Sequence, residues 1–521
     1  MSNAALRYPG AHLAQHGSKP AVILFESGAS MSYAELDAFA NRLARLFRSL
    51  GLQPGAHVAF CVENRLECPA LQWGAHYAGL YYTFASTRLT PGEALYIVQD
   101  CDAAALIVSD ATLGQIGPCL DKLGPAVKTY TLGKAQPGIA SLQEAMAAFD
   151  AAPLEGALEG SEMLYSSGTT GRPKGVKPQL TGKPLGSTAI VADLMQRAFG
   201  VGPDSLYLSP APYYHAAPMK WAQGTLALGG TVVLMEKFDA ENALKAIERH
   251  KVTHTQWVPT MFHRLLGLPE EARKRYDLSS QKVAVHAAAP CPVQTKAEMI
   301  AWWGPIVFEY YSCTEGIGMT FTDSAAWARR PGTVGRALYG KVHIVGEDGK
   351  EVPVGSEGLV YFSGTQPFSY HVMLGYWHKP EETRRVKNAD GWLHTGDQAR
   401  IENGRITITG RIKDMIISGG VNVYPQETEN VLITHPKVFD VAVIGTPHHD
   451  FGEEVRAVVQ LEPGIAPGPQ VAEELVAWCR QQLSPIKCPR QIDFRDSLPR
   501  EPNGKLLKRL LRDEYRAKLG G

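Results

Sequence analysis

The clearest periodic pattern of the chain lies between residues 32 and 50. Its apolar positions recur every three or four residues, which is the spacing of one face of an α-helix. They are Tyr33, Leu36, Phe39, Ala40, Leu43, Leu46, Phe47 and Leu50. Ser32 and Glu35 have the spacing of an N-terminal capping box, and Gly51 is a residue type that commonly ends helices. We therefore predict an amphipathic helix over 32–50.

Beyond this helix, short apolar runs alternate with helical stripes as far as residue 310. The predicted strands are 58–62, 104–109, 231–235, 253–258, 283–286 and 306–310. The predicted helices are 66–79, 239–250 and 293–302. Strands that alternate with helices form parallel sheets with helical crossovers. The expected fold class is therefore α/β, with parallel-type sheets in a large N-terminal domain.

Two changes of pattern divide the chain further. From about residue 331, Val- and Gly-rich strands at 340–345, 358–362 and 405–409 predict a small β-rich subdomain. After residue 411 an α+β pattern begins. Its predicted helices are 425–434 and 471–483, and its predicted strands are 440–445 and 455–461. We expect an N-terminal domain over 1–411, with the β-rich subdomain at about 331–411, and a small mobile C-terminal domain over 412–521. Residues 151–160 read as a linker.

Composition narrows the functional classes. A chain of 521 residues is long enough for two or more domains, and 45% hydrophobic residues can fill their cores. Lys plus Arg and Asp plus Glu are equal at 52 each, so no electrostatic footprint for nucleic acid is present. The eight cysteines form no C-x-x-C pair, which argues against a zinc site and favours a reducing, cytoplasmic location. We see no signal peptide and no apolar run long enough to span a membrane.

The strongest chemical signal is the segment 165–176, Tyr-Ser-Ser-Gly-Thr-Thr-Gly-Arg-Pro-Lys-Gly-Val. Glycine lets backbone N–H groups approach an anion, hydroxyl groups add donors, and Lys174 adds a positive charge. These are the properties of a loop that holds phosphates. The spacing differs from that of the G-x-x-x-x-G-K-[ST] nucleotide loop, so a flexible linker and an unrelated ATPase loop are the alternatives.

Four later segments add chemistry. Residues 310–316 (Tyr-Tyr-Ser-Cys-Thr-Glu-Gly) combine an aromatic face, a hydroxyl and a carboxylate after a predicted strand. Residues 391–397 end in Asp397, a turn aspartate that suits a ribose diol. Residues 410–420 run from charged to apolar to a Gly-Gly pair, and residues 502–505 place Lys505 on a tight turn. Each segment alone is a weak signal.

Together and in this order, the five segments resemble the adenylate-forming superfamily, which contains acyl-CoA synthetases, luciferases and peptide-synthetase adenylation domains. The resemblance extends from about residue 30 to about residue 512. Residues 415–427 and 211–218 resemble the bacterial fatty-acid and bile-acid type CoA ligases more narrowly. The resemblance implies an ATP-dependent carboxylic acid:CoA ligase that forms acyl-AMP and releases AMP and pyrophosphate, with ATP, Mg²⁺ and coenzyme A as the implied ligands.

The resemblance also implies roles for individual residues. Those implied to grip the β- and γ-phosphates are Ser166, Ser167, Gly168, Thr169, Thr170, Gly171 and Lys174. The implied nucleotide contacts are Tyr311 with the backbone of Ala288, Ala289 and Pro290 at the adenine, Thr314 at the α-phosphate, and Asp397 with Arg411 at the ribose. Glu315 would hold Mg²⁺. Lys505 would bridge the α-phosphate and the attacking carboxylate, Lys413 would be the hinge, and Gly419 and Gly420 would line the pantetheine tunnel. The implied catalytic set is Lys505, Glu315, Thr314 and Lys174.

The sequence identifies the acid-binding pocket less clearly than the nucleotide site. Apolar and aromatic residues fall where the family places its acyl tunnel, and a core role is an equal alternative. They are Tyr213, Tyr214, His215, Trp221, Trp257, Met261, Phe262, His286 and Met319. Two interpretations of His215 stay open: a residue that gates the acyl tunnel, or a histidine that is buried in the core. Because the set has no Arg or Asp, we expect an apolar monocarboxylic acid, either fatty, aryl or alicyclic.

Other functions stay open. A stand-alone adenylating enzyme that loads a carrier protein, a luciferase-like oxygenase and a catalytically inactive binding protein are the alternatives. Two positions depart from the family pattern: Lys177-Pro178 stand where many relatives have Thr-His, and Thr428 interrupts the usual Glu-Ile-Glu. We expect the C-terminal domain to alternate between presenting Lys505 and presenting the Gly-Gly pair. A homodimer is possible.

Overall fold

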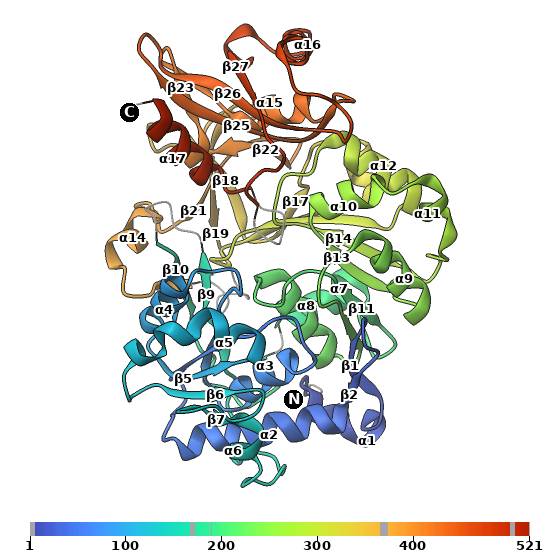
Figure 1. Cartoon of the computed structure of the whole chain (residues 1–521), viewed down its shortest axis with the longest axis vertical. Helices are drawn as coiled ribbons and strands as arrows, with labels where there is room; N and C mark the ends of the chain where they lie inside the picture. Colours follow the sequence, from blue (N-terminus) through green and yellow to red (C-terminus); the bar gives the residue numbers. More distant parts are fainter. Residues whose placement is uncertain (1–5, 167–171, 189, 365–372, 501–505, 520–521) are drawn as a thin grey trace.

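A computed structural model describes residues 6–166, 172–188, 190–364, 373–500 and 506–519 (Figure 1). The larger part of the molecule contains the chain up to about residue 411. The strands and helices that follow form a smaller part at one end, drawn in orange and red at the top of Figure 1. This arrangement confirms the predicted fold class, a large α/β region followed by a small α+β one.

The largest sheet has nine strands and lies in the larger part. Its order is β17 (Arg336–Tyr339), β16 (Met319–Thr322), β15 (Val307–Ser312), β14 (Val283–His286), β13 (His254–Trp257), β11 (Leu206–Ser209), β12 (Thr231–Leu234), β1 (Pro20–Leu24) and β2 (Ser30–Ser32). The six strands from β15 to β1 pair in parallel. Three of them, β12, β13 and β14, are buried at every residue, as expected of a parallel sheet covered on both faces.

A second sheet of six strands is parallel throughout. Its order is β7 (Ala140–Ser141), β6 (Lys128–Thr131), β5 (Ala103–Val108), β3 (His57–Cys61), β4 (Tyr81–Phe84) and β8 (Ser161–Glu162). The predicted strands of both sheets are therefore confirmed, with ends that shift by one or two residues.

Helices cover these sheets and join their strands. In the larger part they are α1 (Leu13–His16), α2 (Tyr33–Ser49), α3 (Cys68–Tyr77), α4 (Pro91–Asp100), α5 (Asp110–Ile116), α6 (Leu142–Met146), α7 (Ile190–Phe199), α8 (Ala216–Ala227), α9 (Ala240–His250), α10 (Pro259–Leu266), α11 (Glu270–Arg275), α12 (Val293–Trp303), α13 (Ser324–Ala328) and α14 (Pro380–Arg385). Helix α2 confirms the amphipathic helix predicted over 32–50. Ser32 and Glu35 form its capping box, an arrangement worth about 1 kcal/mol.

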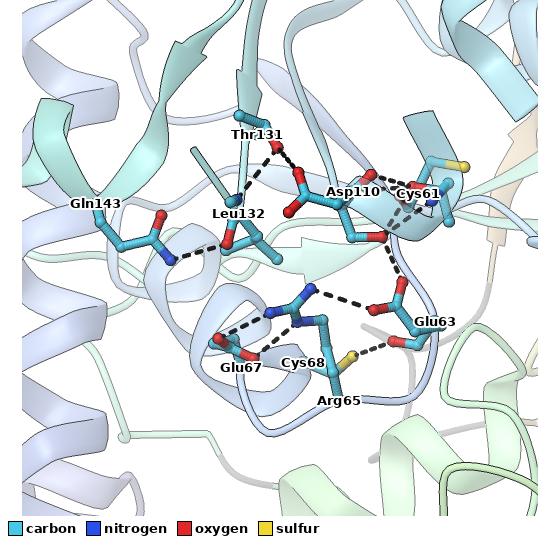
Figure 2. A network of polar contacts seen from close by, with 12 residues as sticks. Cys61, Glu63, Arg65, Glu67, Cys68, Asp110, Thr131, Leu132 and Gln143 are labelled. Carbon is cyan, nitrogen blue, oxygen red and sulfur yellow. Dashed lines mark hydrogen bonds and ion pairs between the residues drawn. The ribbon is translucent and has the colours of Figure 1, made fainter. Parts of the chain in front are cut away.

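A polar network fixes the carboxyl ends of β3, β5 and β6 (Figure 2). The Arg65 guanidinium donates to Glu67 at 2.8 Å and to Glu63 at 3.2 Å. Thr131 donates to Asp110 at 3.3 Å, and the Gln143 amide donates to the Leu132 carbonyl at 3.2 Å. Because the charges are satisfied by one another, this network is a structural connection between strands and helices.

Two smaller sheets connect the larger part to its C-terminal end. One has the order β20 (Met373–Tyr376), β10 (Lys174–Pro178) and β9 (Leu164–Ser166). The other has the order β18 (Lys341–Val345), β19 (Glu357–Ser363), β21 (Leu393–Glu402) and β22 (Arg405–Arg411). The stretch 331–411 therefore supplies more than one sheet, since β17 joins the nine-stranded sheet and β20 joins β10.

The C-terminal part is built on its own sheet. Its strands are β24 (Val421–Val423), β23 (Ile416–Ser418), β26 (Gly452–Leu461), β25 (Val438–His448) and β27 (Gln491–Phe494). Its helices are α15 (Pro425–Leu432), α16 (Pro469–Arg480) and α17 (Lys508–Leu519). Helix α17 was not predicted, because charged residues dominate its sequence. It buries Leu511 and Tyr515 against β25 and β26. Among the helices that the structure describes, none has the length and apolar character needed to cross a bilayer.

Candidate active site

The two ends of the glycine-rich segment lie on paired strands. Strands β9 and β10 are antiparallel, with Lys174 opposite Ser166 and Gly175 opposite Tyr165. Five residues predicted to contact phosphate, Ser167, Gly168, Thr169, Thr170 and Gly171, lie outside the described residues, and their roles stay predictions. The strand pair nevertheless fixes both ends of the segment, because Ser166 and Lys174 stand opposite one another.

Lys174 is 7% exposed, which is unusual for a lysine. Its ammonium forms an ion pair with Glu382 of helix α14. The same nitrogen lies 5.1 Å from the centre of the Tyr376 ring, within the range of a cation–π contact. A buried ammonium requires such partners, because transfer of an unpaired charge out of water is very unfavourable. Lys174 is therefore held in a defined position by two residues of one distant segment.

Thr314 and Glu315 lie in the turn between β15 and β16. The Tyr376 hydroxyl donates to Glu315 Oε1 at 2.8 Å. The Met373 backbone N–H donates to the Glu315 carbonyl at 2.9 Å. Strand β20 thus contacts both Lys174 and Glu315, and one tyrosine joins the predicted phosphate residue to the predicted metal residue.

Asp397 joins three elements from two sheets. It is 3% exposed and stands directly opposite Arg411 in the β21–β22 pair. The Tyr311 hydroxyl donates to Asp397 Oδ2 at 2.7 Å, and Arg411 Nε donates to Oδ1 at 2.7 Å. Since a carboxylate accepts about four hydrogen bonds, this geometry is compatible with two further bonds from a diol. The residues predicted for adenine and ribose are therefore in direct contact with one another.

The charges of this group shift the pKa values of its members. The Asp397 carboxylate raises the pKa of Arg411, although the Arg411 side chain is 43% exposed. Burial, together with the Asp397 carboxylate, raises the pKa of Tyr311 well above its usual range. Tyr311 therefore stays a neutral hydrogen-bond donor, which fixes the orientation of its ring.

The loop after β14 carries an unusual backbone conformation. Ala288 has a φ of +75°, a region that residues other than glycine rarely adopt. Ala288 is exposed, whereas Ala287 before it is buried. A strained, exposed backbone at the carboxyl edge of a parallel strand is typical of a ligand-binding loop. The adenine contact predicted for Ala288, Ala289 and Pro290 stays a prediction that this loop supports.

The residues predicted for the acid pocket are mostly buried in the core. Those with almost no exposed surface are Tyr213, Trp221, Trp257, Met261, Phe262 and His286. The Tyr213 hydroxyl donates to Gln72, and Trp257 Nε1 donates to Thr255 at 2.6 Å. Tyr214, His215 and Met319 keep partial exposure. These contacts are those of core side chains, so the assignment of the set to acid binding stays a proposal.

His286 has a distinct environment within this set. It is fully buried at the end of β14, and its Nε2 lies 3.7 Å from the Glu309 carboxylate. Glu309 in turn pairs with the buried Lys296 at 2.6 Å. Burial, with the Lys296 charge as a second cause, lowers the pKa of His286 well below its usual range. His286 is therefore a neutral ring beneath the Ala288 loop.

The residue predicted as the hinge and the Gly-Gly pair lie on the C-terminal side. Lys413 is exposed in a 3-10 turn, η4 (Ile412–Asp414), and its carbonyl accepts a hydrogen bond from Arg512 at 2.7 Å. Gly419 and Gly420 form the turn between β23 and β24, and both have positive φ, as a two-residue hairpin of this type requires. Lys505 lies outside the described residues.

Sequence reasoning missed three residues that hold the site together. Tyr376 and Glu382 contact Lys174 as described. Asn64 is buried and donates to the carbonyls of Ala211 (3.1 Å) and Met235 (2.8 Å), while its own oxygen accepts from the Tyr213 N–H at 2.7 Å. The acidic Pro-Glu-Glu after Lys379 marks a helix start, and this was the available signal for Glu382. For Tyr376 and Asn64 the sequence carries no such signal.

The atypical segment, which begins at Lys177 within β10, is also anchored. Lys177 Nζ lies 3.5 Å from the Trp377 ring centre and 3.1 Å from His57 Nε2. Burial and the nearby Lys177 charge lower the pKa of His57 to about 4, so His57 is neutral beside the ammonium. Farther along, Thr181 donates to Glu159 at 2.9 Å. The predicted linker 151–160 is thus irregular in structure but packed against this segment.

The arrangement suits a phosphorylated nucleotide. Lys174 offers charge for phosphates, the Asp397 carboxylate suits a diol, and the Tyr311 ring offers an aromatic face. The donor set also fits Mg²⁺, which prefers carboxylate and hydroxyl oxygens such as those of Glu315 and Thr314. Fold and site together define a class of protein. It is an enzyme that acts on a nucleoside triphosphate and is built from a large α/β domain and a small C-terminal domain.

Comparison with known sequences gives the family. The sequence model of the AMP-binding enzymes matches residues 11–377, and the model of the AMP-binding enzyme C-terminal domain matches residues 427–505. The chain belongs to the AMP-binding enzyme family, and within it to the acyl-CoA synthetase branch of the adenylate-forming superfamily. The predicted membership of the adenylate-forming superfamily is therefore confirmed. The chain is an AMP-forming acid–thiol ligase, for which ATP and CoA are substrates.

Three similar proteins illustrate the branch. A 3-[(3aS,4S,7aS)-7a-methyl-1,5-dioxo-octahydro-1H-inden-4-yl]propanoyl:CoA ligase of Rhodococcus jostii is 33% identical, over 93% of this chain and 94% of that protein. The long-chain-fatty-acid–CoA ligase FadD13 of Mycobacterium tuberculosis is 32% identical, over 94% of this chain and 93% of that protein. The solved structure of the anthranilate CoA ligase AuaEII with anthranoyl-AMP is 25% identical, covers 100% of this chain and 99% of that one, and has a TM-score of 0.85.

Proposed function

We propose that this enzyme joins an apolar monocarboxylic acid to coenzyme A through an acyl-AMP intermediate, with release of AMP and pyrophosphate. The observation that carries the proposal is the contact of Tyr311 and Arg411 with the buried Asp397. This contact joins two sheets at residues that suit a nucleoside, and Glu315 lies only four residues beyond Tyr311. The named relatives act on alicyclic, fatty and aryl acids, and all three chemistries stay within the proposal.

In the proposed first step, a carboxylate oxygen of the acid attacks the α-phosphorus of ATP and pyrophosphate leaves. Both reactants are anions, so the protein must neutralise charge and align the reacting atoms. Lys174 with Ser166 and the segment after it would hold the leaving phosphates. Thr314 would contact the α-phosphate, and Glu315 would hold Mg²⁺. Asp397, supported by Arg411, would bind the ribose hydroxyls.

In the proposed second step, the CoA sulfur attacks the acyl carbon and AMP leaves. We propose that Lys413 is the hinge that brings Gly419 and Gly420 to the adenylate for this step. Exposed apolar side chains support this, since Ile417 is 51% and Val421 is 47% exposed on the hairpin that carries the glycines. Such side chains fit a surface that is covered in a second arrangement of the two domains.

Further properties belong to the same proposal. We take Mg²⁺ to be the metal at Glu315 and the cytoplasm to be the location. The location is supported by the eight cysteines, all of which are free thiols in the described chain. A homodimer stays a prediction. Transfer of the acyl group to a carrier protein instead of CoA is the alternative for the second step.

The proposal is tested with a panel of acids of graded chain length and ring size. AMP release is measured for each acid with and without CoA, with a reaction lacking acid as control. We expect AMP release to depend on CoA for the preferred acid, because AMP leaves only when a thiol attacks the adenylate. If AMP release is the same without CoA for every acid, the ligase assignment is wrong.

A further inference from the structure

We propose that Glu382 is a built-in counterion that holds Lys174 in the nucleotide-free enzyme and is displaced by the terminal phosphates of ATP. The inference rests on the proposed function, because the phosphate role of Lys174 is part of it. It assigns to helix α14 a part in nucleotide binding, namely competition with the polyphosphate for one buried ammonium.

The first argument is the burial of both partners. The side chains of Lys174 and Glu382 are only 9% and 23% exposed. An ammonium at such a position is stable only when an anion compensates for its lost hydration. The Tyr376 ring, 5.1 Å from Lys174 Nζ, adds cation–π attraction but no negative charge. Glu382 is therefore the anion that compensates for the charge of the buried Lys174 ammonium.

The second argument is the way α14 is attached. Strand β20 pairs with β10 in the register Val176 opposite Tyr376, so the segment that carries Glu382 is fixed to the strand that carries Lys174. The Thr383 hydroxyl accepts from the Tyr376 N–H at 2.9 Å and donates to the Lys379 carbonyl at 2.9 Å. These bonds hold the helix next to the strand pair, whereas the Glu382 side chain is one flexible arm that can rotate away.

The third argument is a comparison of charges. Glu382 presents one negative charge to Lys174, whereas the terminal phosphates of ATP present several on neighbouring oxygens. Coulomb attraction at equal distance is proportional to charge, so the polyphosphate replaces the carboxylate when it binds. A neutral ligand, or one with a single negative charge, is attracted to Lys174 much less strongly. The pair thus favours polyanions, and each nucleotide that binds must break it.

The matched experiment replaces Glu382 by glutamine and its exposed neighbour Glu381 by glutamine as the control. Binding of ATP and of inorganic pyrophosphate is measured by calorimetry, without acid or CoA. We expect Glu382→Gln to bind both ligands about tenfold more tightly than wild type, since no ion pair has to be broken. We also expect the variant without nucleotide to melt at a lower temperature than wild type. Added ATP should raise its melting temperature by more than it raises that of wild type.

Two outcomes would overturn the proposal. Equal or weaker binding by Glu382→Gln would mean that the pair persists in the bound state or positions Lys174 for phosphate. If that variant does not fold, Glu382→Asp is measured instead, because its shorter arm weakens the pair. We expect it to bind pyrophosphate about threefold more tightly, and unchanged affinity would reject the proposal. A wild-type enzyme that binds no ATP would instead reject the proposed function.

Discussion

Replacement of Lys505 by alanine is expected to slow acyl-adenylate formation about a thousandfold, the upper range for removal of one charge-stabilising donor. Transfer of a synthetic acyl-AMP to CoA should stay close to the wild-type rate. The reason is that only the first step brings two anions together, and a lysine supplies a compact positive charge for that encounter. Lys505 lies outside the described residues, so this role rests on the family resemblance.

The two half-reactions are measured separately. Acid-dependent exchange of labelled pyrophosphate into ATP reports the first step, and thioester formed from synthetic acyl-AMP reports the second. Lys518→Ala is the control, because Lys518 is a 60% exposed lysine of the same C-terminal region. Equal loss of both half-reactions in Lys505→Ala would contradict the division of labour between the two conformations.

Replacement of Asp397 by asparagine is expected to lower kcat/KM for ATP about a hundredfold and to destabilise the protein by about 2 kcal/mol, as loss of a hydrogen bond to a charged group does. The isosteric amide keeps one acceptor oxygen but directs an NH₂ donor at Arg411 or at the Tyr311 hydroxyl. It therefore removes one of the two contacts of the carboxylate and leaves Arg411 without its counter-charge.

Denaturant unfolding and initial rates at varied ATP measure these two effects. Asp390→Asn serves as the control, since Asp390 is exposed in the loop before the same strand. A variant with wild-type stability and a normal KM for ATP would show that the buried Asp397 does not organise the nucleoside site.

Much of the fold was predictable because its patterns are local. The stripe of α2 and its capping box are read within twenty residues, and the parallel strands are short apolar runs. Helix α17 was missed because its buried face comprises few residues, among them Leu511 and Tyr515, within a highly charged sequence. Propensity and periodicity carry little signal when packing against another element decides the structure.

The sequence named candidate site residues one by one, but it did not predict the contacts between them. The roles of Lys174, Glu315, Tyr311 and Asp397 came from the family resemblance, which rests on the order of the motifs along the chain, and these roles stay predictions. The connection of Lys174 to Glu315 through Tyr376 was not predictable, because β20 and β10 are about two hundred residues apart and pair only in the folded protein. The acid pocket could not be predicted for a related reason. The same types of aromatic residue line a protein core and a binding tunnel, so the sequence does not distinguish them.

Transfer of an oxygen isotope tests the central claim most directly. The acid is labelled with ¹⁸O in its carboxylate and turned over with ATP and CoA, and the products are analysed by mass spectrometry. The attacking oxygen bonds to the α-phosphorus, and it stays there when the thiol breaks the acyl carbon–oxygen bond. The account predicts one ¹⁸O atom in each AMP and none in pyrophosphate. Unlabelled AMP, or label in pyrophosphate, would contradict an acyl-adenylate intermediate.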